Sequence, residues 1–407
     1  MSVHSSHNVQ AKDCCEDASS RTITAIRTLS LKDYLCPESR PQFLSEMRDS
    51  LMEIGTFYIK DHGVPTEVTD GAMKAIQDYF ALPLEEKSKM HIRNSQHFRG
   101  YKLMGEEMTN NQIDHREQLQ FAPEQTVESS FVPTTSRHWE GLHGPNQWPL
   151  DILALVPEFK SSVLQFMDQL EILSQHLMEA VALSLNLEAT YFRELFGSSP
   201  YYRLKCAKYP SVEKADTIGC GAHKDTGFLT VLLQDMVGGL QGQDPVTGQW
   251  LDTCPVPETF IVTMGEAIEK LTGGLYHATV HRVLNNTSGQ NRYSIPFFFD
   301  PSLSSKIPHR IPALASLRRS VSSTSSMSMS MSMPMSTSAS SLTSLSDEES
   351  CSEDELDHMM DALKIHHGKD DALSSQDVEG WSNGDHIFET VQRCHPEVFS
   401  RWYGREL

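Results

Sequence analysis

The chain has 407 residues and a formal net charge of −20 at pH 7. Such acidity argues against a nucleic-acid-binding protein, which usually carries a basic patch, and the absence of any run of 18 apolar residues argues against a membrane span. The N-terminus lacks the apolar core of a signal peptide, and the eight cysteines show no disulfide or CxxC spacing. We therefore expect a cytoplasmic protein with free thiols and no nucleic-acid or membrane partner, and we expect it to be a monomer.

The first 150 residues predict a polar tail followed by a mixed N-terminal domain. Residues 1–20 are polar, and we expect them to be disordered. We assign residues 21–150 to a leading domain because strand-like and helix-like segments alternate at its start. The expected strands cover residues 23–31 and 55–60, and the expected helices cover residues 39–53 and 66–81.

Residues 91–150 contain Gly, Pro, His and Trp without a helical or strand period, so we expect long loops there. Aromatic loops of this kind often line a pocket rather than fill a core. Phe98 and Tyr101 are therefore candidates for contact with a substrate.

Residues 151–309 predict a long helix followed by a β-rich core. Apolar residues form one helical stripe from residue 157 to 185, which we expect to pack on the back of a sheet. From residue 201 the pattern changes to short strands, for example at 229–234, 259–263 and 294–299. Turn residues recur at intervals of about 8–12 residues, which is typical of a sandwich, jelly roll or barrel. The expected fold class is α+β with a mainly β core and flanking helices.

The composition changes again from about residue 310 to 378. Fifteen of the thirty-one residues from 316 to 346 are Ser, and residues 347–361 carry eight Asp or Glu without Lys or Arg. Such a segment has little apolar surface to bury, so we predict a disordered Ser/Met/acidic insertion. Residues 379–407 then predict an amphipathic closing helix, in which Phe388 is another candidate for contact with a substrate.

Two histidines and a carboxylate near the middle of the chain predict a metal site. His223 and Asp225 share one strand face if their segment is extended, and His281 follows 56 residues after Asp225. Two histidines and one carboxylate leave coordination positions open and are diagnostic of non-haem Fe(II) oxygenases. His277, four residues before His281, is the alternative third ligand.

Arg292 and Ser294 lie beyond His281 at a spacing that places both on one strand face. The planar guanidinium of Arg binds a carboxylate through two parallel hydrogen bonds, and a Ser hydroxyl can add a third. Tyr209 is a candidate for a further hydrogen bond. Together these residues would hold the far carboxylate of an organic acid whose other end chelates the iron.

The motifs around these residues resemble the 2-oxoglutarate- and Fe(II)-dependent dioxygenases of the isopenicillin N synthase type. The resemblance is carried by residues 221–225, 227–235, 238–241, 279–283 and 292–298. The N-terminal half is similar to the leading domain of that family at 55–59, 62–65 and 80–89, and residues 393–403 are similar to its C-terminal helix. The resemblance covers nearly everything except residues 1–20 and about 310–378.

The resemblance implies a double-stranded β-helix, or distorted jelly roll, that carries Fe(II) on His223, Asp225 and His281. It implies that 2-oxoglutarate is bound through Arg292 and Ser294 and that O2 is consumed while succinate and CO2 are released. The substrate C–H bond undergoes hydroxylation, desaturation or ring formation, and ascorbate is a candidate reductant. The alternative within the family is an oxidase like isopenicillin N synthase or aminocyclopropane-carboxylate oxidase, which keeps these residues but does not use 2-oxoglutarate.

We expect the substrate to be a small, mostly apolar natural product, because aromatic residues surround the expected mouth of the site. Phe98, Tyr101, Phe298 and Phe388 are predicted to contact it. The alternative from another class is a catalytically inactive scaffold whose insertion binds a partner, but the complete set of iron and carboxylate ligands argues against it.

Overall fold

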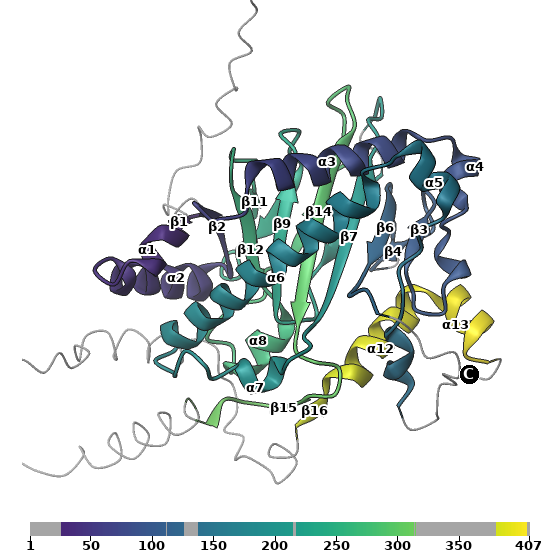
Figure 1. Ribbon diagram of the computed structural model, residues 1–407. Helices are drawn as coiled ribbons and strands as arrows, with labels where there is room; N and C mark the ends of the chain where they lie inside the picture. The colour runs from purple at the N-terminus through teal and green to yellow at the C-terminus, as the bar shows by residue number, and fades with distance from the viewer. Residues whose placement is uncertain are drawn as a thin grey trace, which may run out of the picture.

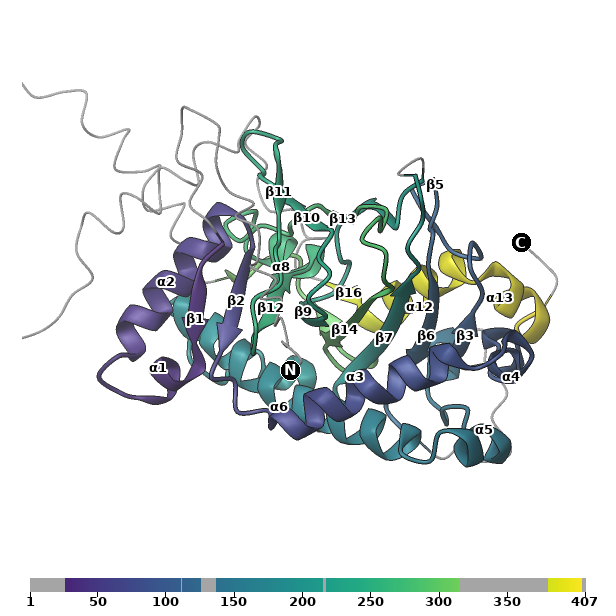
Figure 2. The ribbon, with the colours of Figure 1, turned by 90° about the horizontal axis from the view of Figure 1, so that it is seen from above.

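Two facing β-sheets form the centre of the protein in the computed structural model, which describes residues 26–110, 112–125, 137–214, 217–312, 314 and 380–404. Helices cover the outer face of the larger sheet, and the smaller sheet lies against its inner face (Figures 1 and 2). Two facing sheets are the arrangement predicted as a jelly roll.

The larger sheet has eight strands and takes residues from both halves of the chain. In spatial order these are β1 (Thr28–Ser30), β2 (Thr56–Lys60), β12 (Phe260–Met264), β9 (Leu229–Gln234), β14 (Arg292–Asp300), β7 (Tyr201–Tyr209), β6 (Glu117–Phe121) and β3 (Gly100–Lys102). β1 and β2 run parallel, and the other neighbours are antiparallel. Strands from residues 21–150 and 151–309 therefore share one sheet, and the domain division near residue 150 stays a prediction.

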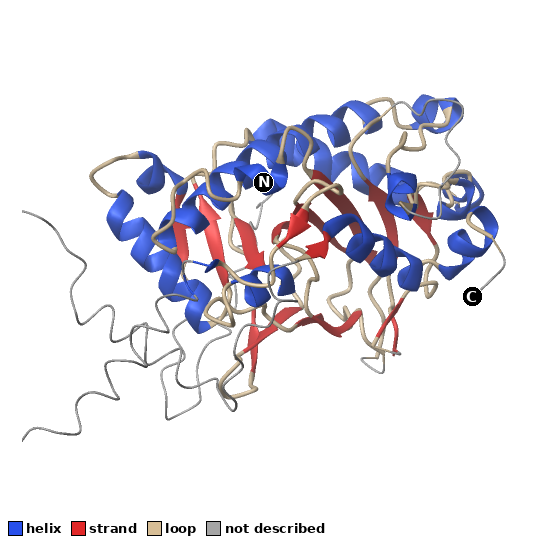
Figure 3. Ribbon diagram, turned by 90° about the horizontal axis from the view of Figure 1, so that it is seen from below, coloured by secondary structure: helices blue, strands red, loops and turns tan. Residues whose placement is uncertain are grey.

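The smaller sheet is antiparallel and lies on the side of the larger sheet that faces away from the long helices (Figure 3). Its strands, in spatial order, are β11 (Trp250–Asp252), β10 (Leu240–Gln243), β13 (His281–Val283) and β8 (Cys220–His223). Two short antiparallel pairs lie outside both sheets, β4 (Met108–Thr109) with β5 (Gln112–Ile113) and β15 (Lys306–Ile307) with β16 (Trp381–Ser382).

The long helix α6 (Phe159–Ser184) follows from its apolar stripe and packs on the back of the larger sheet beside α3 (Thr66–Ala81). The stripe residues are buried, and each such side chain contributes about 1.5–3 kcal/mol of burial free energy. The other helices in residues 26–312 are α1 (Leu31–Leu35), α2 (Arg40–Glu53), α4 (Leu84–Ser88), α5 (Leu150–Leu155), α7 (Arg193–Phe196), α8 (Glu266–Leu271) and the short 3-10 helices η1 (Ile92–Asn94) and η2 (His138–Leu142). None of the described helices is both long enough and apolar enough to cross a membrane.

The region from residue 91 to 150 is not purely irregular, because β3 and β6 form the far edge of the larger sheet. All five residues of β6 are buried, although Gln118 and Gln120 alternate with apolar residues. Gln120 donates its side-chain amide to the carbonyl oxygen of Phe98 at 2.7 Å. Both faces of this strand are buried, so its alternating polar residues do not mark a solvent-exposed face.

The closing segment forms two helices rather than one, α12 (Asn383–Cys394) and α13 (Pro396–Trp402). Pro396 has no backbone N–H and its ring disfavours helical geometry at His395, where φ is −136° and the helix ends. At the other end of the predicted insertion, Ile311 is fully buried, so the packed chain extends past residue 309. Most of the insertion and the N-terminal tail lie outside the described residues.

Candidate active site

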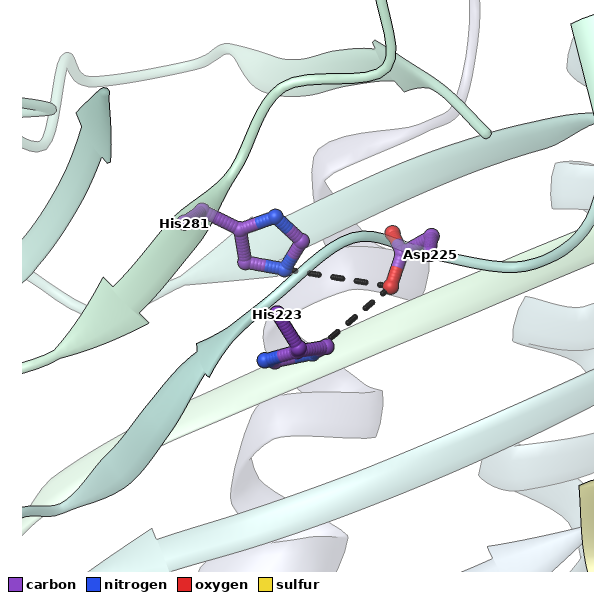
Figure 4. A group of neighbouring side chains, drawn as sticks. All are labelled: His223, Asp225 and His281. Atoms are coloured by element: carbon purple, nitrogen blue, oxygen red, sulfur yellow. Dashed lines mark ion pairs between the residues drawn. The ribbon is translucent and has the colours of Figure 1, made fainter. Parts of the chain in front are cut away.

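His223, Asp225 and His281 converge between two paired strands (Figure 4). His223 ends β8, His281 begins β13, and antiparallel pairing sets these two residues directly opposite each other. The Nε2 atom of each histidine lies 3.8 Å from Oδ1 of Asp225. One ligand atom from each residue lies within 4.8 Å of the others, which is a spacing that a single metal ion can bridge.

Asp225 reaches this group from a loop, which corrects the expectation that it shares a strand with His223. β8 ends at His223, and the chain beyond it turns the carboxylate toward both rings. Thr230 of β9 donates its hydroxyl to Oδ2 of Asp225 at 2.6 Å, so Oδ1 faces the histidines. Buried Asp300 holds the same loop by accepting the N–H of Phe228 at 3.0 Å.

Backbone carbonyls orient both imidazole rings. Nδ1 of His223 lies 2.8 Å from the oxygen of Gly221, and Nδ1 of His281 lies 3.0 Å from the oxygen of Thr279. A proton on Nδ1 leaves Nε2 as the metal-binding atom.

The protonation states of the group also suit a metal. Burial and the neighbouring His223 lower the pKa of His281. Burial opposes ionisation of Asp225, but His281, His223 and the Thr230 hydrogen bond bring its pKa below the usual value. Neutral imidazole and ionised carboxylate are the forms that coordinate metals.

Glu269 of α8 connects the two segments that carry the histidines. Its Oε2 accepts the Lys224 ammonium at 2.6 Å, and its Oε1 accepts the N–H of Ala278 at 3.1 Å. His277 lies on this side of the site, with Nδ1 3.8 Å from Oε1 of Glu269. Among the described residues, the group that can hold a metal includes His281 and not His277, so the geometry favours His281.

Arg292 and Ser294, at the start of β14, are both buried in the wall of the same cavity. The Arg292 guanidinium donates Nη2–H to Gln234 at 3.1 Å and lies 4.8 Å from the ring centroid of Tyr209. Within the described residues, Nε and Nη1 of Arg292 have no hydrogen-bond partner although they are buried. Unpaired buried donors on a cation are costly, so this guanidinium fits an acidic ligand such as the far carboxylate of 2-oxoglutarate.

The cavity that joins these groups lies between the two sheets and has a volume of about 110 Å³. That is several times the space one water molecule needs, so a small organic acid fits. Part of its wall is apolar and includes Leu232, Leu240, Ile261 and Phe298.

Of the four aromatic residues predicted to contact substrate, the structure brings only Phe298 to this cavity. Phe98 and Phe388 belong to a separate apolar cluster, with ring centroids 6.0 Å apart. Tyr101 lies in the main core and donates its hydroxyl to Glu117 at 2.5 Å. These three side chains fill space between helices and sheet edge, which corrects the expectation that they form a mouth.

Arg116 also lines the cavity, although no sequence motif marks it as a site residue. Arg116 immediately precedes β6, and Glu117 of β6 pairs with Lys208 of β7. That pairing carries Arg116 to Tyr209, whose hydroxyl accepts Nη1–H at 3.4 Å. The sequence around Arg116 does not show how β6 pairs with β7, because the paired residues Glu117 and Lys208 are 91 residues apart.

The chain matches two family models. Residues 26–151 match the model described as non-haem dioxygenase in morphine synthesis N-terminal, and residues 200–301 match the 2OG-Fe(II) oxygenase superfamily. A 1-aminocyclopropane-1-carboxylate oxidase from Dictyostelium mucoroides is 33% identical over 307 residues, which cover 67% of this chain and 80% of that protein. The 2-oxoglutarate-dependent dioxygenase frbJ from Dothideomycetidae sp. (strain 11243) is 32% identical over 288 residues, with coverages of 68% and 76%.

Solved structures share the fold. A putative 2OG-Fe(II) oxygenase family protein from Caulobacter crescentus has a TM-score of 0.60 at 26% identity and covers 74% of this chain and 99% of its own. Full-length Neurospora crassa T7H, solved with alpha-KG and thymine, has a TM-score of 0.61 at 24% identity, with coverages of 71% and 89%. The predicted jelly-roll fold is thereby confirmed, and so are Fe(II) and 2-oxoglutarate as cofactors. The chain belongs to the 2OG-Fe(II) oxygenase superfamily and is an Fe(II)- and 2-oxoglutarate-dependent dioxygenase of the isopenicillin N synthase type, as its motifs predict.

Proposed function

We propose that this enzyme oxidises a C–H bond of a small, mostly apolar organic molecule by hydroxylation, desaturation or ring formation. The observation that carries the proposal is the sharing of one cavity by the histidine–carboxylate group, the Arg292 guanidinium and apolar side chains. T7H, solved with thymine, supports a small organic substrate rather than a macromolecule.

In this proposal His223, Asp225 and His281 hold the iron, and Arg292 and Ser294 hold the far carboxylate of 2-oxoglutarate beside Tyr209. Bound iron and 2-oxoglutarate supply the activation of O2, with succinate and CO2 as co-products. The protein orients both ligands, and burial lowers the pKa of His281 and so favours its neutral, metal-binding form.

A second candidate is an iron oxidase that keeps the same residues but does not consume 2-oxoglutarate. The name of the 33% identical Dictyostelium relative is the observation that favours it. The two candidates differ in the fate of 2-oxoglutarate, so succinate production during turnover separates them.

The test has two stages. Anaerobic addition of Fe(II) and then 2-oxoglutarate should produce the metal-to-ligand charge-transfer absorption, and admission of O2 should yield succinate. Untargeted metabolite profiling of cells with and without the gene should then show a small metabolite that accumulates when the gene is missing. No charge-transfer band and no succinate would contradict use of 2-oxoglutarate, and activity confined to peptides or DNA would contradict the substrate class.

A further inference from the structure

The cavity wall carries two cations besides Arg292. Lys205 of β7 lies four residues before Tyr209 and so shares its strand face, and Arg116 approaches from the neighbouring edge of β6. Both side chains line the cavity that contains the histidine–carboxylate group. Arg116 and Arg292 both contact Tyr209, whereas Lys205 lies four residues away from Tyr209 along β7.

These cations are incompletely neutralised by the protein. Lys205, Lys102 and Arg116 surround the single carboxylate of Glu107 at nitrogen–oxygen distances of 3.3, 3.6 and 3.7 Å. Asp114 adds one more carboxylate, 2.9 Å from Arg116. Three cations therefore face two carboxylates.

One hydrogen-bond donor of the cluster has no partner within the described part of the chain. Nε of Arg116 is buried and has no hydrogen-bond partner among the described residues. Lys205 approaches Glu107 only at 3.3 Å, which is long for a charge-assisted bond.

A neighbouring cluster on the opposite face of β7 gives an example of closely paired charges in this protein. Lys208 and Lys87 lie 2.8 and 2.6 Å from the two oxygens of Glu117, and Tyr101 donates a third hydrogen bond. Neither lysine lines the cavity. Lys205 and Arg116, in contrast, both line the cavity, and the contact of Lys205 with Glu107 is longer at 3.3 Å. This cluster can therefore accept a further anionic group from the cavity.

We propose that the substrate is itself a carboxylic acid, whose carboxylate binds Lys205 and Arg116 while its apolar body lies against Phe298 and the apolar wall. The inference rests on the proposed function, in which Arg292 and the iron already bind the two ends of 2-oxoglutarate. A single excess positive charge matches one carboxylate better than a doubly charged phosphate, because an unbalanced charge in a buried site is costly. The acid group also gives an otherwise apolar substrate a fixed orientation toward the iron.

The test compares acids with their neutral amides. The full chain, loaded anaerobically with Fe(II) and saturating 2-oxoglutarate, is titrated calorimetrically with benzoate, phenylacetate and hexanoate and with the corresponding amides. We expect at least one acid to bind roughly ten- to hundred-fold tighter than its amide, the usual effect of hydrogen bonds to a charged group. Lys205→Met should bring the acid to the affinity of the amide, Lys205→Arg should retain the preference, and Lys208→Met is the matched control that should leave it unchanged.

Equal binding of acids and amides by the wild type, or binding of neither, overturns the proposal without relying on any variant. An undiminished acid preference in a folded Lys205→Met protein overturns it as well. The charge-transfer band with 2-oxoglutarate is recorded in every sample. If that band is present and the acid preference is missing, only this inference fails, whereas loss of the band in the wild type removes the proposed function itself.

Discussion

At the scale of single residues, Arg292 has the surroundings that most directly require a ligand. Its side chain is 1% exposed, and two of its nitrogen atoms lack a partner in the described part of the chain. Replacing Arg292 by Ala should raise the KM for 2-oxoglutarate at least about 30-fold, since loss of one partner of a buried charge pair costs about 2–5 kcal/mol.

Iron content of the Arg292→Ala protein, measured after reconstitution, should equal that of the wild type. Arg282→Ala is a suitable control, because Arg282 stacks on Trp250 at 3.9 Å and lies outside the cavity wall. An unchanged KM would assign the carboxylate of 2-oxoglutarate to another cation of the cavity wall, either Arg116 or Lys205.

The two histidines of the 277–281 segment allow a matched pair of substitutions. His281→Ala should lower iron affinity by more than the 10–100-fold typical of residues that only orient a ligand. His277→Ala should retain iron, because His277 lies beside Glu269 and outside the group that can hold the metal. Metal stoichiometry after dialysis against a chelator measures both, and equal retention by the two variants would contradict the assignment of His281.

Residue spacing predicted the polar part of the site better than the apolar part. Charged and polar side chains are seldom buried in a core unless they are paired. The spacing of His223, Asp225, His281 and Arg292 therefore indicates a site. Aromatic side chains serve cores and pockets equally well, and Phe98 and Phe388 lie in a core cluster that their sequence neighbourhood does not distinguish from a pocket. Arg116 depends on strand register, which sequence spacing does not report.

At the scale of elements, α8 stabilises the site through the Glu269 carboxylate. Burial alone would raise the pKa of Glu269, but its bonds to His277, Lys224 and the Ala278 N–H lower it to about 2. A carboxylate whose pKa is lowered on folding contributes stability above its unfolded pKa of about 4.3 and loses it as pH falls toward 2. Because Glu269 is only half buried, solvent screens part of this effect, and the metal-free protein should lose about 1–2 kcal/mol of unfolding free energy across that window.

Urea unfolding of the metal-free protein at pH 5, 4 and 3 checks this contribution. In Glu269→Gln the protein should be less stable at pH 5, and its stability should fall less between pH 5 and 3. Equal pH dependence in the variant and the wild type would show that Glu269 is not the group responsible.

Elements with one strong period were predictable from sequence. The helix expected at residues 66–81 is α3 with the same bounds, and the stripe of α6 is buried as expected. The strands β3 and β6 were missed because they have only three and five residues and lie in a segment that otherwise shows no regular period. The break between α12 and α13 was missed although Pro396 signals it locally, because the apolar spacing continues across the proline.

At the scale of the whole molecule, the low-complexity segment joins two points that the fold already holds together. β15 pairs with β16, so Ile307 lies opposite Trp381 on either side of it. Deleting residues 315–375 should leave the melting temperature and succinate production unchanged, because the fold on either side keeps its contacts. A shorter loop also has a slightly smaller entropic cost of closure.

Deleting residues 383–404 is the contrasting control. It removes α12 and α13. Ile387, Phe388 and Val391 of α12 are buried in the apolar cluster that also contains Phe98, so this deletion should lower the melting temperature. A similar loss in the 315–375 deletion would show that this segment contributes to the packed structure.

The larger sheet combines strands from distant parts of the chain, and this affects how the protein folds while it is being synthesised. β2 pairs with β12, so its partner emerges from the ribosome about 200 residues later, which corresponds to roughly 10–40 s at usual rates of synthesis. During that time α2 can cover one face of β2, but the hydrogen-bonding edge of an apolar strand stays open. Co-translational chaperones and slower translation before residue 264 are thus expected to affect the yield of this enzyme more than its final stability.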